Sequence, residues 1–208
     1  MMRGGLKLGF LASHGGSSMK AILDAIADGR LRASAAVVIS NNADAPALAY
    51  AGALGVPTYH LSETRLGGAA TADRAIAETL AARGAEVVVL SGYLRKVGPL
   101  TLARYRGRIL NIHPGPLPRY GGPGMYGRHV HEAVIAAGEE MSGITIHIVD
   151  AEYDHGPVIA RREVALVPGD TAASLAARIQ ALEPPFFVET LCRIAAGELK
   201  LEGLDEAD

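Results

Sequence analysis

The sequence has few of the features that mark exported, membrane or nucleic-acid-binding proteins. Its 208 residues include one cysteine, Cys192, so no intrachain disulfide can form and a reducing compartment is expected. The apolar stretch in the N-terminal MMRGGLKLGFLA is too short for a signal peptide or a membrane helix. With a formal net charge of −2 and no run of Lys and Arg, the chain offers no broad basic surface. We therefore expect a cytoplasmic protein that binds neither membranes nor nucleic acid.

Several motifs of known catalytic sites are also missing. The chain has neither the three spaced glycines of a dinucleotide-binding loop nor the lysine-containing phosphate loop of nucleotide hydrolases. No Ser-centred nucleophile elbow occurs and Cys192 falls in a predicted helix, so a covalent acyl intermediate has no candidate nucleophile. His129 and His131 point differently on a helix, and no Cys or carboxylate completes a ligand set. No metal is therefore expected.

What is present indicates one α/β domain over residues 1–208. Apolar residues make up 49% of the chain and charged residues 20%, the balance of a globular protein, and no repeat or linker interrupts it. Apolar runs without clean alternation predict buried parallel strands, and helical stretches between them give the order β-α-β-α-β-α-β. This order predicts an open, mostly parallel, doubly wound sheet in a three-layer α/β/α arrangement, with ligands at the carboxyl ends of the strands.

The expected elements follow from these patterns. In the first half, strands are expected at Leu6–Ala12, Ala35–Ser40 and Glu86–Gly92, and helices at Ser18–Ala27, Ala45–Leu54 and Thr71–Arg83. In the second half, strands are expected at Gly107–His113, Ser142–Asp150 and Pro157–Leu166, a loop at HPGPLPRYGGPGMYG and a short helix at His129–Ala137. Asp170 or Thr171 should cap a last helix to about Ala196, which Pro184 and Pro185 should kink or break. The tail LDEAD should be frayed.

The first predicted strand runs into SHGGSSMKAIL, which places two glycines and two serines at the start of a helix. Free backbone N–H groups and the helix dipole favour an anion at such a position, and a substrate phosphate fits this interpretation. The alternative is a tight turn in which the glycines satisfy the backbone geometry and a serine caps the helix. The sequence does not decide between the two.

The segment NIHPGPLP places an amide and an imidazole at a strand end. Asn111 and His113 alternate along the strand, so their side chains point to the same side. An amide donates hydrogen bonds to a developing oxyanion and a histidine changes charge near neutral pH, a pair that suits acyl transfer. Asp154, in a tight loop between two strands, can orient His113 and hold its charged form. Loop anchoring and turn chemistry are the structural alternatives for these residues.

The motifs and their order along the chain resemble those of the phosphoribosylglycinamide formyltransferase family, the folate-dependent transformylases of purine synthesis. The likeness covers roughly the whole chain and rests on HGGSS, VVISNNADAPAL, VVVLSGYLRKV, GRILNIHPGPLP, GITIHIVD, YDHGPVI and RIQALE. It implies a Rossmann-like formyltransferase fold and transfer of a formyl group from 10-formyltetrahydrofolate to the amine of phosphoribosylglycinamide. Formyl folate is then a co-substrate, the partners are small molecules, and the protein is a monomer or a homodimer.

The resemblance also implies roles for individual residues. The N-terminal half would carry the acceptor site, in which the phosphate is held by Gly16, Ser17 and Ser18 and the ribose or glycinamide end lies near Glu183. The C-terminal half would carry the folate site, whose pterin pocket is lined by Leu94, Arg95 and Val97 on one side and by Val149 to Asp154, including Asp150, on the other. The amine would attack the formyl carbon directly. The oxyanion would be stabilised by Asn111 and protonated His113, while Asp154 supports His113 and assists proton shuttling through water.

Two segments depart from the pattern expected of the family. The loop from Arg119 to Arg128 is longer, and reshaping of the folate entrance, contact with a second subunit and a change of acceptor all stay open. HGGSS replaces a Gly-Asn-Gly-Ser-Asn type of loop, so side-chain contacts to phosphate should differ while the backbone N–H donors remain.

Three related activities and one non-enzymatic function are the alternatives. Formyltransferases for initiator methionyl-tRNA or for nucleotide-linked amino sugars usually carry a further domain, and transfer to an amino sugar is the first alternative. A formyltetrahydrofolate hydrolase, the second, would use water as the nucleophile, but its relatives usually have a regulatory domain, and none is expected before Leu6. A folate-binding protein without turnover is disfavoured because Asn111, His113 and Asp154 are all present.

Overall fold

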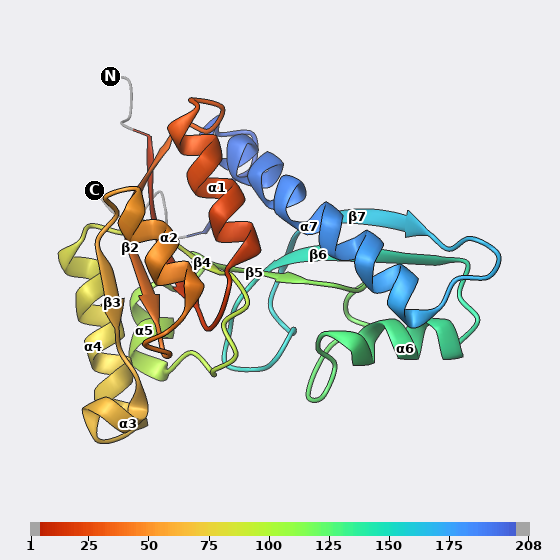
Figure 1. The fold of residues 1–208 in the computed structure, drawn as a ribbon, viewed down its shortest axis with the longest axis horizontal. Helices are drawn as coiled ribbons and strands as arrows, with labels where there is room; N and C mark the ends of the chain where they lie inside the picture. The colour runs from red at the N-terminus through yellow and green to blue at the C-terminus, as the bar shows by residue number, and fades with distance from the viewer. Residues whose placement is uncertain (1–4, 203–208) are drawn as a thin grey trace.

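The computed structural model of the protein describes residues 5–202, and the expectation of a frayed tail at LDEAD lies outside this range. One seven-stranded sheet runs through the molecule in the order β3-β2-β1-β4-β5-β6-β7 (Figure 1). The strands are β1 Leu6–Ala12, β2 Ala33–Ser40, β3 Thr58–His60, β4 Val87–Leu90, β5 Ile109–His113, β6 Met141–Ile148 and β7 Val158–Ala165. The helices are α1 Ser17–Ala27, α2 Pro46–Ala53, α3 Glu63–Leu66, α4 Ala69–Ala82, α5 Pro99–Arg104, α6 Arg128–Ala136 and α7 Ala172–Ala195.

The first five strands in the sheet order are parallel, as the alternation of strands and helices predicts. The pairs β1–β2, β2–β3, β1–β4 and β4–β5 are all parallel. The last two strands differ, because β6 runs antiparallel to β5 and β7 antiparallel to β6. The mostly parallel, doubly wound α/β sheet is thus confirmed, and its antiparallel extension brings β6 beside the end of β5.

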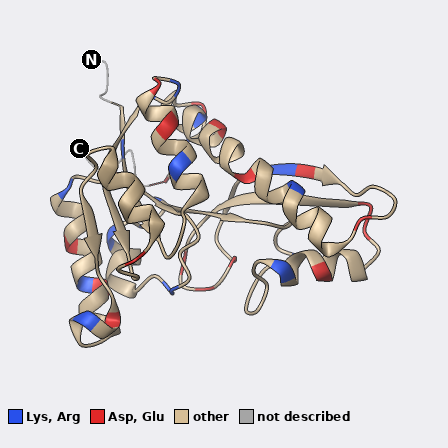
Figure 2. Ribbon diagram, viewed as in Figure 1, with Lys and Arg blue, Asp and Glu red and all other residues tan. Residues whose placement is uncertain are grey.

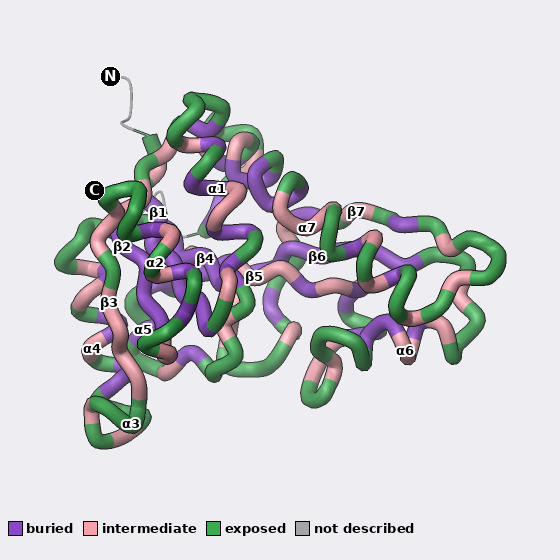
Figure 3. Tube along the Cα trace, viewed as in Figure 1, coloured by how far each residue is buried: buried purple, intermediate pink, exposed green. Residues whose placement is uncertain are grey.

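Two apolar cores lie on opposite faces of the sheet. Successive residues of β1 point to opposite faces, so Phe10 packs in the core that includes α1 and α7, whereas Leu11 packs in the core that includes α4. Gly9 allows α4 to approach closely, since a Cβ at this position would lie 2.5 Å from a methyl carbon of Leu80. The buried central strands and the exposed outer helix faces are visible in Figure 3. The three-layer arrangement therefore follows from the alternation within each central strand.

Helix α7 is continuous through its two prolines, so the break that the sequence allowed does not occur. Its start is as expected, because the Thr171 side chain accepts a hydrogen bond from Ser174 N in a capping box, and it ends at Ala195. The helix is not broken, since it continues without interruption through Pro184 and Pro185. Two backbone N–H donors are lost there, but the following turn buries Phe186 and Phe187 in the core, and this burial outweighs the loss.

The remaining differences concern short elements. The predicted alternation β-α-β-α-β-α-β contains a strand before α4 for which no apolar run was found. The three-residue strand β3 occupies this place. The helices α3 and α5, of four and six residues, were not predicted. No helix or strand occurs between Pro114 and Gly127, which confirms the predicted loop. Lys, Arg, Asp and Glu are interspersed along the elements (Figure 2), and no helix of the described chain is long and apolar enough to cross a membrane.

Candidate active site

The antiparallel pairing of β5 with β6 brings together two polar side chains. Asn111 of β5 lies opposite His147 of β6 in the register, and its Nδ2 atom is 3.2 Å from His147 Nε2. His147 Nδ1 is 2.9 Å from the carbonyl oxygen of Ile148. A carbonyl only accepts hydrogen bonds, so Nδ1 carries a proton and Nε2 of the neutral ring can accept from the Asn111 amide.

Asp154 lies between two histidines. Its Oδ2 atom is 3.4 Å from His113 Nδ1, and its Oδ1 atom is 3.5 Å from His147 Nε2. The backbone N–H of Gly122 donates a further hydrogen bond of 3.1 Å to Oδ2. Asn111, His113, His147 and Asp154 thus form one connected polar cluster, named the polar cluster below, built from two strands and the loop that precedes β7.

The backbone around Asp154 is shaped for this contact. Asp154 has a φ of 55°, a left-handed conformation that Asp tolerates better than most residues. Two positions further on, a Cβ at Gly156 would lie 2.1 Å from the carbonyl oxygen of Ile148, so only glycine fits. The Asp-x-Gly sequence therefore makes a turn, as its structural interpretation requires, and the same turn directs the carboxylate at both imidazoles.

The electrostatics of the polar cluster favour an ionised Asp154. Burial by itself would raise the pKa of its carboxyl, but the contacts with His113 and His147, the charge of His113 and the hydrogen bond from Gly122 outweigh it. The pKa of Asp154 is therefore well below its ordinary value. The ionised carboxylate can accept a hydrogen bond from either imidazole.

His113, like His147, is almost fully buried. Its residue is 3% exposed, and its Nε2 atom is 2.6 Å from the carbonyl oxygen of Tyr120, so Nε2 donates the hydrogen bond. Protonation of Nδ1 would add a donor toward Asp154. His113 does not line the cavity beside Asn111, so it contacts that cavity only through Asp154 in this structure.

A small cavity of about 90 Å³ opens beside three members of the polar cluster, Asn111, His147 and Asp154. Four of the residues that the resemblance assigned to the pterin pocket line it too, namely Arg95, Val97, Val149 and Asp150. Leu94 does not. Its side chain is 66% exposed, and its backbone N–H donates to Ser13 Oγ at 2.8 Å, so it is not free for a ligand.

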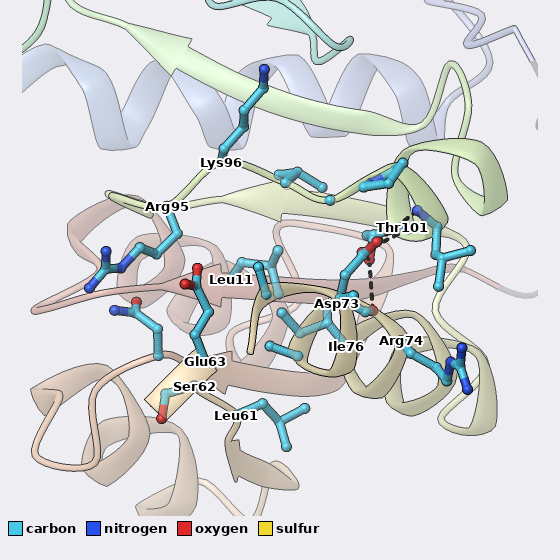
Figure 4. Close-up of a pocket in the computed structure, with 18 of the residues that line it drawn as sticks. Leu11, Leu61, Ser62, Glu63, Asp73, Arg74, Ile76, Arg95, Lys96 and Thr101 are labelled. Atoms are coloured by element: carbon cyan, nitrogen blue, oxygen red, sulfur yellow. Dashed lines mark hydrogen bonds between the residues drawn. The ribbon is translucent and has the colours of Figure 1, made fainter. Parts of the chain in front are cut away.

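A larger cavity of about 570 Å³ lies against the same segment (Figure 4). The two cavities share Tyr93, Arg95, Lys96 and Val97, which belong to the segment between β4 and α5. Helix α4 contributes Asp73 and Ile76 to the larger cavity. Residues 93–98 therefore form a common wall, and we call them the wall segment.

The glycine-rich turn before α1 leaves backbone donors available. Gly16 is the N-cap residue, in a left-handed conformation with φ 61°, and no side chain of the turn caps the helix. The interpretation in which a serine of this turn caps α1 is therefore wrong. Ser91 Oγ accepts from Met19 N at 3.0 Å, while the N–H groups of Ser17 and Ser18 have no acceptor within the described chain. Ser17 is exposed, but Ser18 is only 2% exposed, which leaves its backbone rather than its hydroxyl.

Two serines join this turn to the wall segment. Ser13 Oγ accepts from Leu94 N and donates to Asn41 Oδ1 at 2.6 Å, and Ser13 N donates to the carbonyl of Gly92. Ser91, at the end of β4, accepts from the first turn of α1. The loops after β1 and β4 are thus hydrogen-bonded to each other in both directions.

Glu183 lies in the middle of α7, partly buried. Burial raises the pKa of its carboxyl from 4.5 to about 7. No hydrogen bond or ion pair to this carboxylate occurs among the described residues. Glu183 lines neither of the two cavities at the wall segment.

The long loop from Arg119 to Arg128 begins at the polar cluster. The Tyr120 carbonyl contacts His113 and the Gly122 N–H contacts Asp154, so the start of the loop is tied to both residues. A Cβ at Gly121 would lie 2.9 Å from the Asp154 Cβ, and such packing requires glycine. The loop thus holds the polar cluster from one side.

Sequence reasoning missed His147 and the two backbone groups of the loop. The motif GITIHIVD was recognised, but its histidine was given no role. The signal was present in the period of two along β6, and it becomes specific only with the antiparallel register that sets His147 opposite Asn111. No group of three His, Cys, Asp or Glu side chains suited to a metal occurs in residues 5–202.

Comparison with known proteins gives a consistent result. The formyl transferase family matches residues 6–191 of the chain. Phosphoribosylglycinamide formyltransferase from Escherichia coli is 34% identical over 92% of this chain and 88% of its own length. The crystal structure of glycinamide ribonucleotide transformylase 1 from Symbiobacterium toebii superimposes with a TM-score of 0.86 and 36% identity, covering 97% of this chain and 92% of that one.

A more distant neighbour shares the fold. A formyltetrahydrofolate deformylase from Pseudomonas syringae has a TM-score of 0.84 at 20% identity, and the match covers 97% of this chain and 65% of the deformylase. At this identity the likeness speaks for the architecture alone. The family match and the bacterial relative above carry the assignment, and the chain belongs to the formyl transferase family.

Proposed function

We propose that the protein transfers the formyl group of 10-formyltetrahydrofolate to the amine of phosphoribosylglycinamide, which yields formylglycinamide ribonucleotide and tetrahydrofolate in purine biosynthesis. The observation that carries the proposal is the polar cluster at the small cavity, where Asn111, His147 and Asp154 meet the residues expected to hold the folate. The relatives named phosphoribosylglycinamide formyltransferase, which match nearly the full chain, supply the acceptor.

In the proposed reaction the amine nitrogen attacks the formyl carbon and forms the new C–N bond. The carbonyl oxygen becomes an oxyanion, which the Asn111 amide and a protonated imidazole held by Asp154 stabilise. The bond to N10 of the folate then breaks, its electron pair stays on N10, and the proton lost by the amine is passed to N10. Asp154, ionised at neutral pH, is the group that can relay this proton through water.

The substrates would occupy two neighbouring regions of the sheet edge. The folate pterin would lie in the small cavity between Val97 and Val149, and the acceptor phosphate would bind the N–H groups of Ser17 and Ser18 at α1. An open groove of about 500 Å³, lined by residues that include His14, Asn41 and Arg95, joins the turn before α1 to the wall segment. The acceptor would extend along this groove toward Arg95, which also lines the small cavity.

The proposal extends to the setting of the reaction. We place the enzyme in the cytoplasm, as one catalytic domain that acts as a monomer or homodimer on small molecules, without a metal, nucleic acid or a membrane. The single cysteine and the net charge of −2 support this setting. Transfer to a nucleotide-linked amino sugar and hydrolysis of formyl folate are the competing activities.

The proposal is tested by incubating purified protein with 10-formyltetrahydrofolate and phosphoribosylglycinamide. Absorbance follows tetrahydrofolate release and mass spectrometry follows the formylated product, with the acceptor omitted as control. Release that depends on the acceptor is the expected result. Release without acceptor would identify a hydrolase, and failure with this acceptor but turnover of an amino-sugar nucleotide would assign the other transferase activity.

A further inference from the structure

Asp73, in the first half of α4, makes a set of hydrogen bonds to another helix. Its Oδ2 atom accepts from Leu100 N at 2.8 Å, and its Oδ1 atom accepts from Thr101 N at 3.0 Å and from Thr101 Oγ1 at 2.6 Å. Asp73 is 6% exposed and Thr101 is fully buried. These contacts are drawn in Figure 4 beside the larger cavity.

The carboxylate of Asp73 caps the helix α5 from outside its own chain segment. The N-cap residue of α5 is Gly98, which has no side chain to cap it, and Pro99 follows as the first helical residue. Asp73 supplies the missing acceptors for the two N–H groups after this proline. Gly98 passes so close that a Cβ on it would lie 2.2 Å from Asp73 Cγ. The end of the wall segment is therefore held against α4 at a defined distance.

Hydrogen bonds hold the wall segment near its start and directly after its end. At its start, Leu94 N is bound by Ser13 Oγ, and at its end, Leu100 and Thr101 are bound by Asp73. Arg95 and Val97, which line both cavities, lie between these points. A shift of the start of α5 would therefore move the side of the small cavity that faces Val149.

We infer that Asp73 is a positioning residue for the folate pocket: by capping α5 from α4 it holds the wall segment at the spacing that the pterin requires. This inference rests on the proposed function and adds a residue that contacts neither substrate. Its main effect is expected on the folate side, because Asp73 and Thr101 make no hydrogen bond to the turn before α1 or to the polar cluster among the described residues.

The experiment compares Asp73→Ala, Asp73→Asn and a control in the same helix, Leu80→Val. Leu80 is fully buried in the core between α4 and the sheet and takes no part in the hydrogen bonds of the cap, so its variant should lose stability without losing the cap. Asp73→Ala should raise the KM for 10-formyltetrahydrofolate by roughly tenfold, since three hydrogen bonds to the carboxylate are lost. The KM for phosphoribosylglycinamide should stay within about twofold in every variant.

Asp73→Asn keeps the shape and one acceptor oxygen, so its KM for formyl folate should fall between wild type and Asp73→Ala. Calorimetric titration with tetrahydrofolate gives the same comparison without turnover, and this binding readout also serves if the alanine variant does not fold. Equal tetrahydrofolate affinity in wild type and Asp73→Asn would overturn the inference, as would a loss shared by Leu80→Val. Wild-type protein that binds no tetrahydrofolate would instead contradict the proposed function itself.

Discussion

Asn111 and His147 face each other across the antiparallel pair of β5 and β6, with 3.2 Å between the amide nitrogen and Nε2. The same imidazole nitrogen is 3.5 Å from Asp154 Oδ1. Neutral His147 accepts from Asn111, whereas protonated His147 donates to Asp154 and releases the amide of Asn111. The Asn111 amide has two N–H donors, so one can bind His147 while the other is directed to a substrate oxygen.

Replacement of Asn111 by Ala should lower kcat strongly. Loss of one donor to a developing oxyanion costs about 3 kcal/mol of transition-state stabilisation, or roughly a factor of one hundred or more in kcat. Steady-state kinetics with both substrates checks this, and the KM values should change much less than kcat. Near-wild-type turnover would remove Asn111 from the mechanism.

Replacement of His147 by Ala should act together with Asn111→Ala rather than independently. The two side chains touch, so a double-mutant cycle should give a coupling free energy of roughly 0.5–3 kcal/mol in transition-state stabilisation. The kcat/KM of the two single variants and the double variant provides this value. Strict additivity would show that the observed contact plays no part in catalysis.

Asp154→Asn should lower activity without unfolding the protein, because Asn also tolerates the left-handed backbone at this position. The carboxyl pKa is lowered in the folded state, so its contribution to stability is present above the unfolded pKa of about 4 and is lost as the pH falls through the folded value. Urea unfolding at pH 7 should therefore separate wild type from the variant. The difference should shrink as the pH falls below about 4, and a constant difference would contradict an ionised native Asp154.

Glu183 should give the opposite pH dependence. Its folded pKa is raised from 4.5 to about 7, so the protonated carboxyl stabilises the fold below the unfolded pKa, and this stability is lost as the pH rises through that window. Glu183→Gln cannot ionise and should be more stable than wild type at pH 8, by at most roughly 3 kcal/mol. Melting temperatures at pH 4 and pH 8 check this. Parallel pH profiles for the two proteins would show that burial does not hold the proton on Glu183.

Val97 and Leu94 offer a matched pair for the folate pocket. Val97 lines the small cavity and is 7% exposed, whereas Leu94 is 66% exposed and lies outside it. Val97→Ala removes two methyl groups of packing and should raise the KM for formyl folate roughly tenfold. Leu94→Ala should leave it unchanged. A larger effect at Leu94 would show that the pterin binds on the other side of the wall segment.

Much of the fold could be predicted because its signals are local. The apolar runs and helical spacings located the longer elements of the parallel half within two residues, and of the two expected caps of α7, Asp170 or Thr171, the structure uses Thr171. The uninterrupted helix at Pro184 could not be predicted, because burial of Phe186 and Phe187 is a tertiary effect. Strand β3 and helix α5 were missed for the same reason, since one is set by pairing with β2 and the other by Asp73.

The candidate site likewise combines residues that local motifs identify with residues that only the tertiary structure brings together. Asn111, His113 and Asp154 were identified from motifs, and the structure brings them together. His147 was not assigned, because its relation to Asn111 exists only through an antiparallel register that the sequence did not reveal. Leu94 was placed in the folate pocket from its neighbours in the motif, although its backbone donor is already bound by Ser13.

The crossed hydrogen bonds of Ser13 and Ser91 have a thermodynamic consequence. Because Leu94 N is bound from the β1 side and Met19 N from the β4 side, ordering of one loop by its substrate lowers the entropy cost of ordering the other. We therefore expect the two binding events to be coupled, and linkage requires such coupling to be reciprocal. The factor by which the phosphorylated acceptor tightens folate binding must equal the factor by which folate tightens acceptor binding. The hydroxyls of Ser13 and Ser91 thus couple the two proposed binding sites thermodynamically.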